Sequence, residues 1–438
     1  MIFSFDLLKA HQGDCYLLHC GTKDEPGLVM IDGGPNKVYQ PYLKDRLDKI
    51  RKVRGITEEQ SLMVDLLMVS HVDGDHIQGI LDLTKEEIVA KEASQPRLLN
   101  ILNFWHNSFD ALIEHETGDL TASMKKQFGE AAVSGAEELS DAAKAEVEEE
   151  CEEDPEVIAS SLKVLAGIEQ GFRLRRDAEK LDFPCNPEFD GKPIVARKNS
   201  PAMPIAPGLK FTVVGPMEPE LKALRKKHLK WLEDLRKAGK PVPQALAAYI
   251  DDSVPNLSSI VVLAEVDDKR ILLTGDARGD KILEGLQFTG RLGPGKASTM
   301  QVDLLKVPHH GSANNLAQDF FGRIIAKHYV FSGNGDYGNP EREALEMLFK
   351  ARGDEDYAIH LTYPIKEIDA RREEDWKKQQ KKEKKSTKKA VREDWSPEKH
   401  GLKAFFEAKQ NLAEKVRIVE KGKPHVIDLL DALDERLK

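Results

Sequence analysis

The 438-residue sequence has little cysteine, no long apolar run and no basic leader. Its four cysteines form no CxxC pair and are too few for a disulfide framework, which favours a reducing, cytoplasmic environment. No run approaches the roughly 18 apolar residues that a membrane-spanning helix requires, and the first residues do not resemble a signal peptide. We therefore expect a cytoplasmic protein with no membrane role.

Common nucleotide-binding and catalytic patterns are missing as well. The sequence contains no Walker or Rossmann glycine pattern and no separate Ser-His-Asp or Cys-His arrangement. The formal net charge of −10 gives no general attraction to polyanions, so any contact with nucleic acid has to be local. Hydrophobic residues make up 40% of the chain, which is enough to build one large domain with insertions.

The most informative stretch lies at residues 64–79. Its apolar part, at 66–69, has the length and composition of a buried strand. Four potential metal ligands follow it within six residues: His71, Asp73, Asp75 and His76. Two imidazoles and two carboxylates this close together would repel or stay unpaired unless a cation gathered them, and mixed nitrogen and oxygen ligation suits zinc, manganese or iron. A polar turn that caps a helix is the alternative interpretation.

The pattern His71-Val-Asp-Gly-Asp-His76 closely resembles the signature of the metallo-β-lactamase fold, in the variant where Asp replaces the middle His. This variant is similar to the cytoplasmic-type domain of ComEC competence proteins, which take up DNA, and to their stand-alone relatives. Three further segments match in the expected order, at 31–34 (IDGG), 272–276 (LLTGD) and 305–312 (LKVPHHGS). The Gly-Asp pair after the first expected strand, Gly13-Asp14, also resembles the family.

The resemblance implies an α/β protein built as an αββα sandwich, in which two sheets face each other and helices cover both outsides. We expect this domain at residues 1–365, with an acidic helical insertion at about 119–180. Residues 366–438 are expected to form a charged helical extension. The resemblance does not cover residues 119–158 or the chain beyond about residue 365.

The resemblance also implies two divalent metal ions, zinc in the first place and manganese or iron as alternatives. The expected ligands are His71, Asp73, Asp75, His76, His106, Asp276 and His309. Asp276 would bridge the two ions, and Asp32 would support the metal-binding loop through hydrogen bonds. His106 stands where the common form of the fold has a third histidine, although a histidine among aromatic residues is often packed in a core. His310 is the alternative to His309, which is nearer to the strand end.

Catalytic roles are predicted for Asp75, His310 and Lys306. Asp75 could accept a proton, and His310 could contact the substrate or protonate a leaving group. Lys306 and Ser312 could meet a phosphate, unless Lys306 reaches solvent. His11 is either a support for the metals from below or a surface histidine.

The leading functional hypothesis is hydrolysis of a phosphodiester, in a nucleic acid or a nucleotide, by a hydroxide that bridges two metals. The ComEC-like branch is associated with DNA processing, and lysines at 377–389 between Trp376 and Trp395 could bind phosphates, or else form a solvated helix. Hydrolysis of a small ester, lactam or thioester is the second hypothesis. The third is an interaction protein with a structural metal site, which binds a protein partner through the insertion or the extension.

Overall fold

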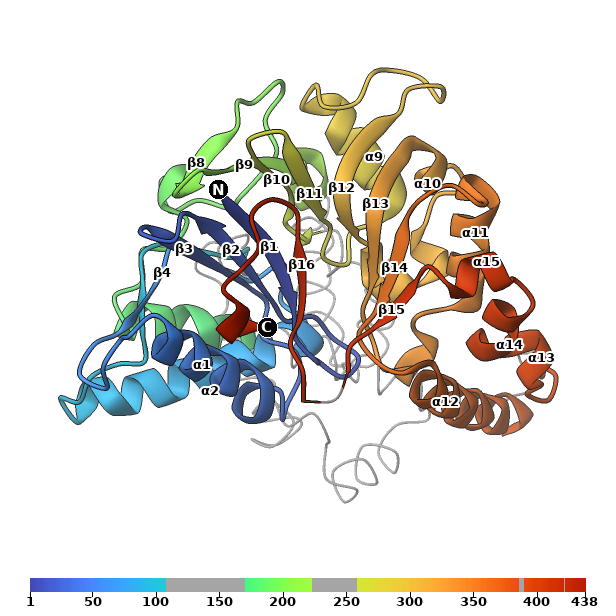
Figure 1. Ribbon diagram of the computed structural model, residues 1–438, viewed down its shortest axis with the longest axis horizontal. Helices are drawn as coiled ribbons and strands as arrows, with labels where there is room; N and C mark the ends of the chain where they lie inside the picture. The colour runs from blue at the N-terminus through green and yellow to red at the C-terminus, as the bar shows by residue number, and fades with distance from the viewer. Residues whose placement is uncertain (108–169, 223–257, 386–389, 421) are drawn as a thin grey trace, which may run out of the picture.

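The computed structural model describes residues 1–107, 170–222, 258–385, 390–420 and 422–438 (Figure 1). The chain has the mixed α/β composition that the sequence predicts, with strands and helices throughout these ranges. Most of the predicted acidic insertion lies outside the described residues, and its last part, 170–180, is helical. None of the described helices combines the length and the apolar character that crossing a membrane would need.

The described strands form two large sheets and a small one. The first large sheet has six strands, in the order β16 (His425–Asp428), β1 (Ile2–Leu7), β2 (Tyr16–Gly21), β3 (Pro26–Ile31), β5 (Leu66–Met68) and β7 (Phe104–Trp105). The second has eight strands, in the order β15 (Val416–Ile418), β14 (Ala358–Leu361), β13 (Ile324–Phe331), β12 (Met300–Lys306), β11 (Lys269–Leu273), β10 (Val261–Val266), β9 (Leu209–Gly215) and β8 (Met203–Ala206). The small sheet pairs β4 (Leu62–Val64) with β6 (Leu99–Ile101).

The principal helices lie on the outer faces of the two large sheets (Figure 1). On the side of the first sheet they are α1 (Asp45–Val53) and α2 (Gly74–Glu92). On the side of the second sheet they are α9 (Gly279–Phe288), α10 (Phe320–Arg323), α11 (Arg342–Arg352), α12 (Ile365–Lys385) and α14 (Leu402–Glu407), and α13 (Pro397–His400) and α15 (Gln410–Ala413) complete the helices of the C-terminal part.

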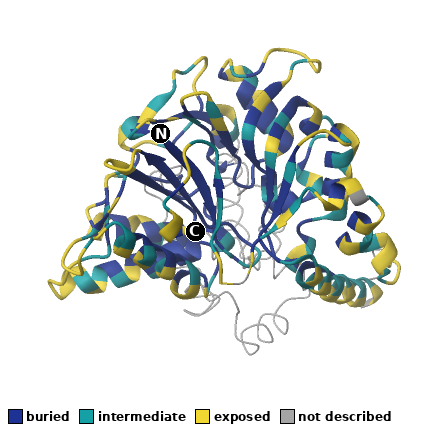
Figure 2. Cartoon of the chain, viewed as in Figure 1, coloured by how far each residue is buried: buried dark blue, intermediate teal, exposed yellow. Residues whose placement is uncertain are grey.

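Three apolar clusters hold these layers together. Alternate residues of a strand point to opposite faces of its sheet, so each sheet contributes to the core between the sheets and to a core under its helices. Phe3 and Phe5 of β1 pack between the sheets with Val262 of β10. The intervening residues of the strands face the helices, and Figure 2 shows the central strands largely buried between the exposed outer surfaces. The order of layers is therefore helices, sheet, sheet, helices.

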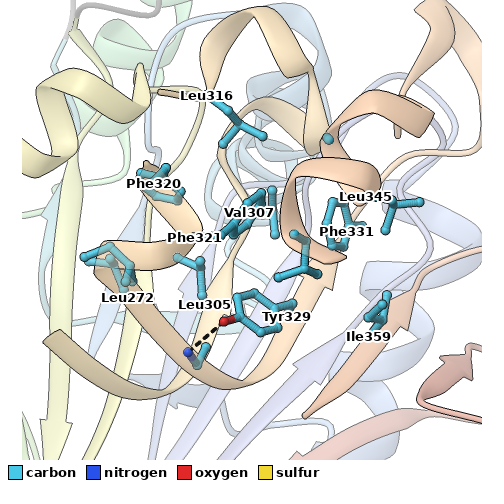
Figure 3. Close-up of a cluster of buried hydrophobic side chains, with 14 of the residues drawn as sticks. Leu272, Leu305, Val307, Leu316, Phe320, Phe321, Tyr329, Phe331, Leu345 and Ile359 are labelled. Carbon is cyan, nitrogen blue, oxygen red and sulfur yellow. Dashed lines mark hydrogen bonds between the residues drawn. The ribbon is translucent and has the colours of Figure 1, made fainter. Parts of the chain in front are cut away.

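The core between the second sheet and the helices that cover it is rich in aromatic side chains. Phe320 and Phe321 of α10 pack with Leu305 of β12 and Tyr329 of β13 (Figure 3). Tyr329 is fully buried, and its hydroxyl accepts a hydrogen bond from the backbone N–H of Ala326 at 3.0 Å. This core fixes the positions of β12 and β13, whose ends carry part of the site described below.

Parallel pairing gathers the carboxyl ends of several strands at one edge. In the first sheet β3, β5 and β7 run parallel, and in the second sheet β11 to β15 do. The segments that leave β3, β5, β11 and β12 therefore emerge on the same side of the two facing sheets. These are the segments that carry the sequence motifs.

The C-terminal part differs from the sequence prediction. Helices were expected to continue to the end of the chain, but residues 416–418 form β15 and residues 425–428 form β16. β15 extends the second sheet beside β14, and β16 pairs with β1 in the first sheet. The prediction of an all-helical extension is wrong here, because the pairing partner of each short edge strand lies far away in the sequence.

Candidate metal centre

The candidate site lies where the two sheets meet at this edge. Among the described residues, four buried side chains offer ligand atoms that all lie within 4.8 Å of one another: Asp14, His76, Asp276 and His310. Asp14 lies in the turn between β1 and β2, and His76 lies in the first turn of α2. Asp276 follows β11, and His310 lies in the turn after β12. Both sheets therefore contribute to the cluster.

Four imidazole rings lie within 3.8 Å of the carboxylate of Asp276; three of them are buried, and the fourth, that of His309, is more exposed. The Nε2 atom of His76 lies 3.4 Å from Oδ1 of Asp276. The Nε2 atoms of His310 and His71 lie 3.3 Å and 3.8 Å from Oδ2. Four ligands bound at about 2.0–2.1 Å in tetrahedral geometry would lie about 3.4 Å apart. The observed separations are close to those of ligands around one metal ion.

The other ring nitrogen of each histidine has a partner that fixes the ring. Nδ1 of His76 lies 2.8 Å from Oδ2 of Asp32, and Nδ1 of His71 lies 3.1 Å from Oγ of Ser70. Nδ1 of His310 lies between Oγ of Ser332, at 2.9 Å, and a carboxylate oxygen of Asp14. A hydrogen donated from Nδ1 leaves the lone pair on Nε2, which is the arrangement of metal-binding histidines.

The atoms that face the middle of the cluster are buried and form no hydrogen bond with the described part of the chain. They are Nε2 of His71, Nε2 of His76, Nε2 of His310 and Oδ1 of Asp276. Buried polar atoms are nearly always satisfied, so a group of such atoms that converge on one point needs an explanation. A divalent cation fits this donor set, because it would bind nitrogen and oxygen atoms together.

Asp32 supports the loop as the sequence predicts. Its carboxylate accepts hydrogen bonds from the backbone N–H and the hydroxyl of Ser70, both at 2.7 Å, besides its contact with His76. The neighbouring backbone is also close to α2, because a Cβ atom on Gly79 would lie 2.0 Å from the carbonyl oxygen of Gly33. Glycine at position 79 therefore allows α2 to approach the loop that carries Asp32.

The carboxylates of the cluster favour positive charge on His310, whereas burial and the neighbouring His76 lower the pKa of His71 to about 4. Burial lowers the pKa of His310, but the carboxylates of Asp276 and Asp14 outweigh it and raise the pKa to about 9. Burial also opposes a charge on Asp276, whose pKa the neighbouring His310 and His76 nevertheless hold well below its ordinary value. The same carboxylates would attract a metal cation, which binds a histidine in its neutral form.

His309 and His310 occupy different positions in the turn that follows β12. Both residues have left-handed backbone conformations, with φ of 47° and 53°. The side chain of His310 is 2% exposed and that of His309 is 29% exposed, with its Nε2 atom 3.7 Å from Asp276. His310 thus lies in the cluster and His309 at its rim, whereas the sequence analysis prefers His309 as the ligand.

The remaining predicted ligands lie at different distances from the cluster. Asp75 is at the rim, with Oδ2 3.7 Å from Nε2 of His310. Asp73 caps α2 and accepts a hydrogen bond from the N–H of Gly74. His106 is buried and stacks on Phe104, with ring centroids 4.6 Å apart. His106 is not among the four residues of the compact cluster.

Lys306 is buried in the site instead of reaching solvent. Its ammonium donates a hydrogen bond to the carbonyl oxygen of Gly275 at 2.9 Å and lies 2.5 Å from Oδ2 of Asp14. Ser312, the other candidate for a phosphate contact, donates a hydrogen bond from its hydroxyl to Glu341 at 3.3 Å. The ring of His11 lies edge-on to that of Tyr42.

Asp14 is a site residue for which the sequence predicts no role. The Gly-Asp pair after the first strand was the signal that could have identified it, because this pair matches the family pattern. Its partners in the site come from the other end of the domain, at Lys306 and His310. Local sequence gives no indication of these contacts.

Comparisons with known proteins give little further information. No protein-family model matches the chain. Microtubule-associated protein 1A of Rattus norvegicus is 37% identical over 82 residues, which cover 18% of this chain. The matched part spans 3% of the length of that protein, so the match does not show a family.

Proposed function

We propose that the chain is a metal-dependent hydrolase of the metallo-β-lactamase fold, with two divalent ions and a phosphodiester as substrate. The observation that carries the proposal is the convergence of the Nε2 atoms of three buried histidines on the buried carboxylate of Asp276. The order of layers and the order of the motifs along the chain support the fold. The order of layers agrees with the resemblance, which rests on the motifs alone.

The residues suggest two overlapping positions for metal ions. His76, His310 and Asp276 would hold the more buried ion, and Asp75 would contribute from the rim. His71 and Asp73 would hold the other ion together with Asp276, and zinc fits this set of nitrogen and oxygen ligands. Such ions, when bound, lower the pKa of water and stabilise negative charge on the attacked group.

The protein's own groups would orient and accept protons around this centre. Asp32 and Ser70 hold the rings of His76 and His71, so that their Nε2 atoms keep the direction that ligation requires. Asp75, with its side chain 13% exposed at the rim, is placed to accept a proton during turnover. His309, more exposed and 3.7 Å from Asp276, is placed to contact a substrate or protonate a leaving group.

The choice of a phosphodiester rests on the resemblance and on the lysines of α12. Two of these lysines, Lys377 and Lys378, pair with glutamates one turn earlier, at 2.6 Å and 2.9 Å. Such exposed pairs contribute little stability and leave the helix solvated. A contact between α12 and nucleic acid would therefore depend on the other lysines of the run. Fold alone does not select a substrate within this versatile architecture.

The experiment that tests the proposal combines elemental analysis with a substrate screen. The parent protein should hold about two transition-metal ions per chain, the number of a two-metal site, and should hydrolyse a chromogenic phosphodiester or single-stranded DNA. The double variant Asp75→Ala, His76→Ala should lose at least one ion and the activity. Asp280→Ala, an exposed carboxylate on α9, is the matched control and should retain both.

Each outcome distinguishes one of the hypotheses. Cleavage of esters or lactams alone would favour the second hypothesis, and bound metal without any hydrolysis would favour an interaction protein. Full metal content in the double variant would overturn the ligand assignment.

A further inference from the structure

The ammonium group of Lys306 lies beside two buried carboxylates that would otherwise need a metal cation to balance their charge. Its Nζ atom is 2.5 Å from Oδ2 of Asp14 and 3.5 Å from Oδ1 of Asp276, and the side chain is 2% exposed. A lysine buried to this extent needs negative partners, and here it has two carboxylates and the carbonyl oxygen of Gly275. Lys306 therefore belongs to the charge balance of the site.

Both oxygens of the Asp14 carboxylate already face protein groups. Oδ2 forms an ion pair with the ammonium of Lys306 at 2.5 Å, although the geometry is not that of a hydrogen bond. Oδ1 accepts a hydrogen bond from the hydroxyl of Tyr16 at 2.7 Å and lies 3.1 Å from Nδ1 of His310. Although Asp14 lies in the compact cluster, its contacts are those of a residue that positions other groups.

The buried charges support the same interpretation. Asp14, Asp32 and Asp276 are buried and carry three negative charges, against one positive charge on Lys306. With neutral histidines, the excess of two negative charges equals the charge of one divalent ion. Uncompensated charge in a protein interior is costly, so a single ion would bring the buried part of the site to neutrality.

We propose that Lys306 is a built-in cation of the metal centre, which leaves room for one tightly bound divalent ion in its buried part. Asp14 is then a positioning residue that acts through Lys306 and His310, and it is not a metal ligand. A second ion would bind more weakly, with His71 and the half-buried Asp73. This inference rests on the proposed metal centre, and it specifies the ligands and the order in which the two ions bind.

The test measures the affinity for Zn²⁺ alone, by competition with a chromogenic chelator, for the parent, Asp14→Asn, Lys306→Met and the double variant. Asp14→Asn removes the negative charge nearest to the ammonium of Lys306. It should lower the Zn²⁺ affinity of the buried site by about 10–100-fold, the range for loss of a residue that supports the ligands. Lys306→Met removes a positive charge close to the ion and should tighten binding by roughly tenfold or more. The double variant has the net charge of the parent and should bind within about threefold of it, since charges dominate the difference.

Thermal melting of each variant and elemental analysis accompany the titration. Lys327→Met, an exposed lysine on β13, is the matched control and should leave the affinity unchanged. If Asp14→Asn fails to fold, Lys306→Met and the double variant still decide the matter. Tighter binding in the former and parental binding in the latter support the proposal.

Three results would overturn the inference. If the double variant binds as weakly as Asp14→Asn, then Asp14 is itself a ligand. If Lys306→Met binds no more tightly than the parent, then the ammonium does not act as a cation of the centre. Failure of the parent to bind Zn²⁺ would overturn the proposed function together with this inference.

Discussion

Acidification is expected to weaken the contact between the two sheets, because three histidines form a hydrogen-bonded row across it. Nδ1 of His328 on β13 lies 3.0 Å from Nε2 of His360 on β14. Nδ1 of His360 lies 2.8 Å from Nε2 of His425 on β16. The row joins the eight-stranded sheet to the edge strand of the six-stranded sheet. A row of neutral rings can be satisfied by one hydrogen between each pair, whereas additional protons would place donor against donor.

The surroundings of the row keep the rings neutral. Burial, and then the neighbouring His425 and His328, lower the pKa of His360 to about 2. Burial also lowers the pKa of His328 and His425. The charged groups that act on these rings are Asp303 of β12, Lys327 of β13, Asp356 before β14, Arg417 of β15 and Asp6 of β1.

The sign and size of the effect follow from linkage. Because the folded pKa of His360 is lowered, the unfolded chain takes up a proton that the folded chain does not, and stability is lost as the pH falls below the unfolded value. With an unfolded pKa of about 6.5, this single residue should cost about 1.3 kcal/mol of unfolding free energy between about pH 7.5 and about pH 5.5. The rings of His328 and His425 are more exposed, and their lowered pKa also reduces the stability of the folded chain as the pH falls.

Urea unfolding of the parent and of His360→Gln at both pH values measures this contribution. Glutamine can donate and accept hydrogen bonds but does not titrate, so the variant should lose about 1.3 kcal/mol less than the parent over this interval. The measurements are made with excess chelator, so that release of metal does not add its own pH dependence. An equal loss in parent and variant would refute the neutral row.

The remaining predictions concern the site and the tail. The geometry favours His310 over His309 as the ligand, so we expect the opposite of the sequence-based preference. His310→Ala should lower the affinity for metal at least tenfold, as expected for loss of a group that holds the ion, whereas His309→Ala should keep the metal by elemental analysis and hydrolyse slowly. The opposite result would restore His309 as the ligand. Gly79→Ala should destabilise the protein by about 1–3 kcal/mol and reduce its metal content, because the added Cβ atom overlaps the carbonyl oxygen of Gly33; an unchanged melting temperature would contradict this. Replacing the lysines at 377–385 by Gln should weaken binding of single-stranded DNA and reduce the slope of its salt dependence by about 0.7 per lost phosphate contact, while turnover of small substrates continues; unchanged affinity would leave α12 as a solvated helix.

The sequence predicts those parts of the site in which a polar motif directly follows an apolar strand. His71, His76 and Asp276 follow β5 and β11 in this way, and the structure brings their side chains together. The supporting contacts of Asp32 with Ser70 and His76 also agree with the prediction. In each case the signal is local, because the end of a buried strand fixes where the next few side chains lie.

The features that the sequence did not reveal depend on contacts between distant segments. The partners of Asp14 are at the other end of the domain, and the edge strands β15 and β16 are defined by pairing with β14 and β1. The inward direction of His310 depends on the left-handed turn that it shares with His309. His309 and His310 are the same residue type at adjacent positions, so the sequence does not distinguish them. The conformation of the turn decides which of the two faces the site.

The distribution of the ligands over the two sheets gives the candidate centre a structural role as well. His71 and His76 belong to the first sheet and its helix α2, whereas Asp276 and His310 follow strands of the second sheet. Neither sheet alone supplies the three imidazoles and the central carboxylate. An ion bound by this set would connect the sheets at one edge, and its binding free energy would add to the stability of the folded chain.

At another place between the same sheets, the row from His328 to His425 connects them through hydrogen bonds. Both connections require neutral histidines, so acid would weaken them together, and the release of a bound ion would be coupled to the separation of the sheets.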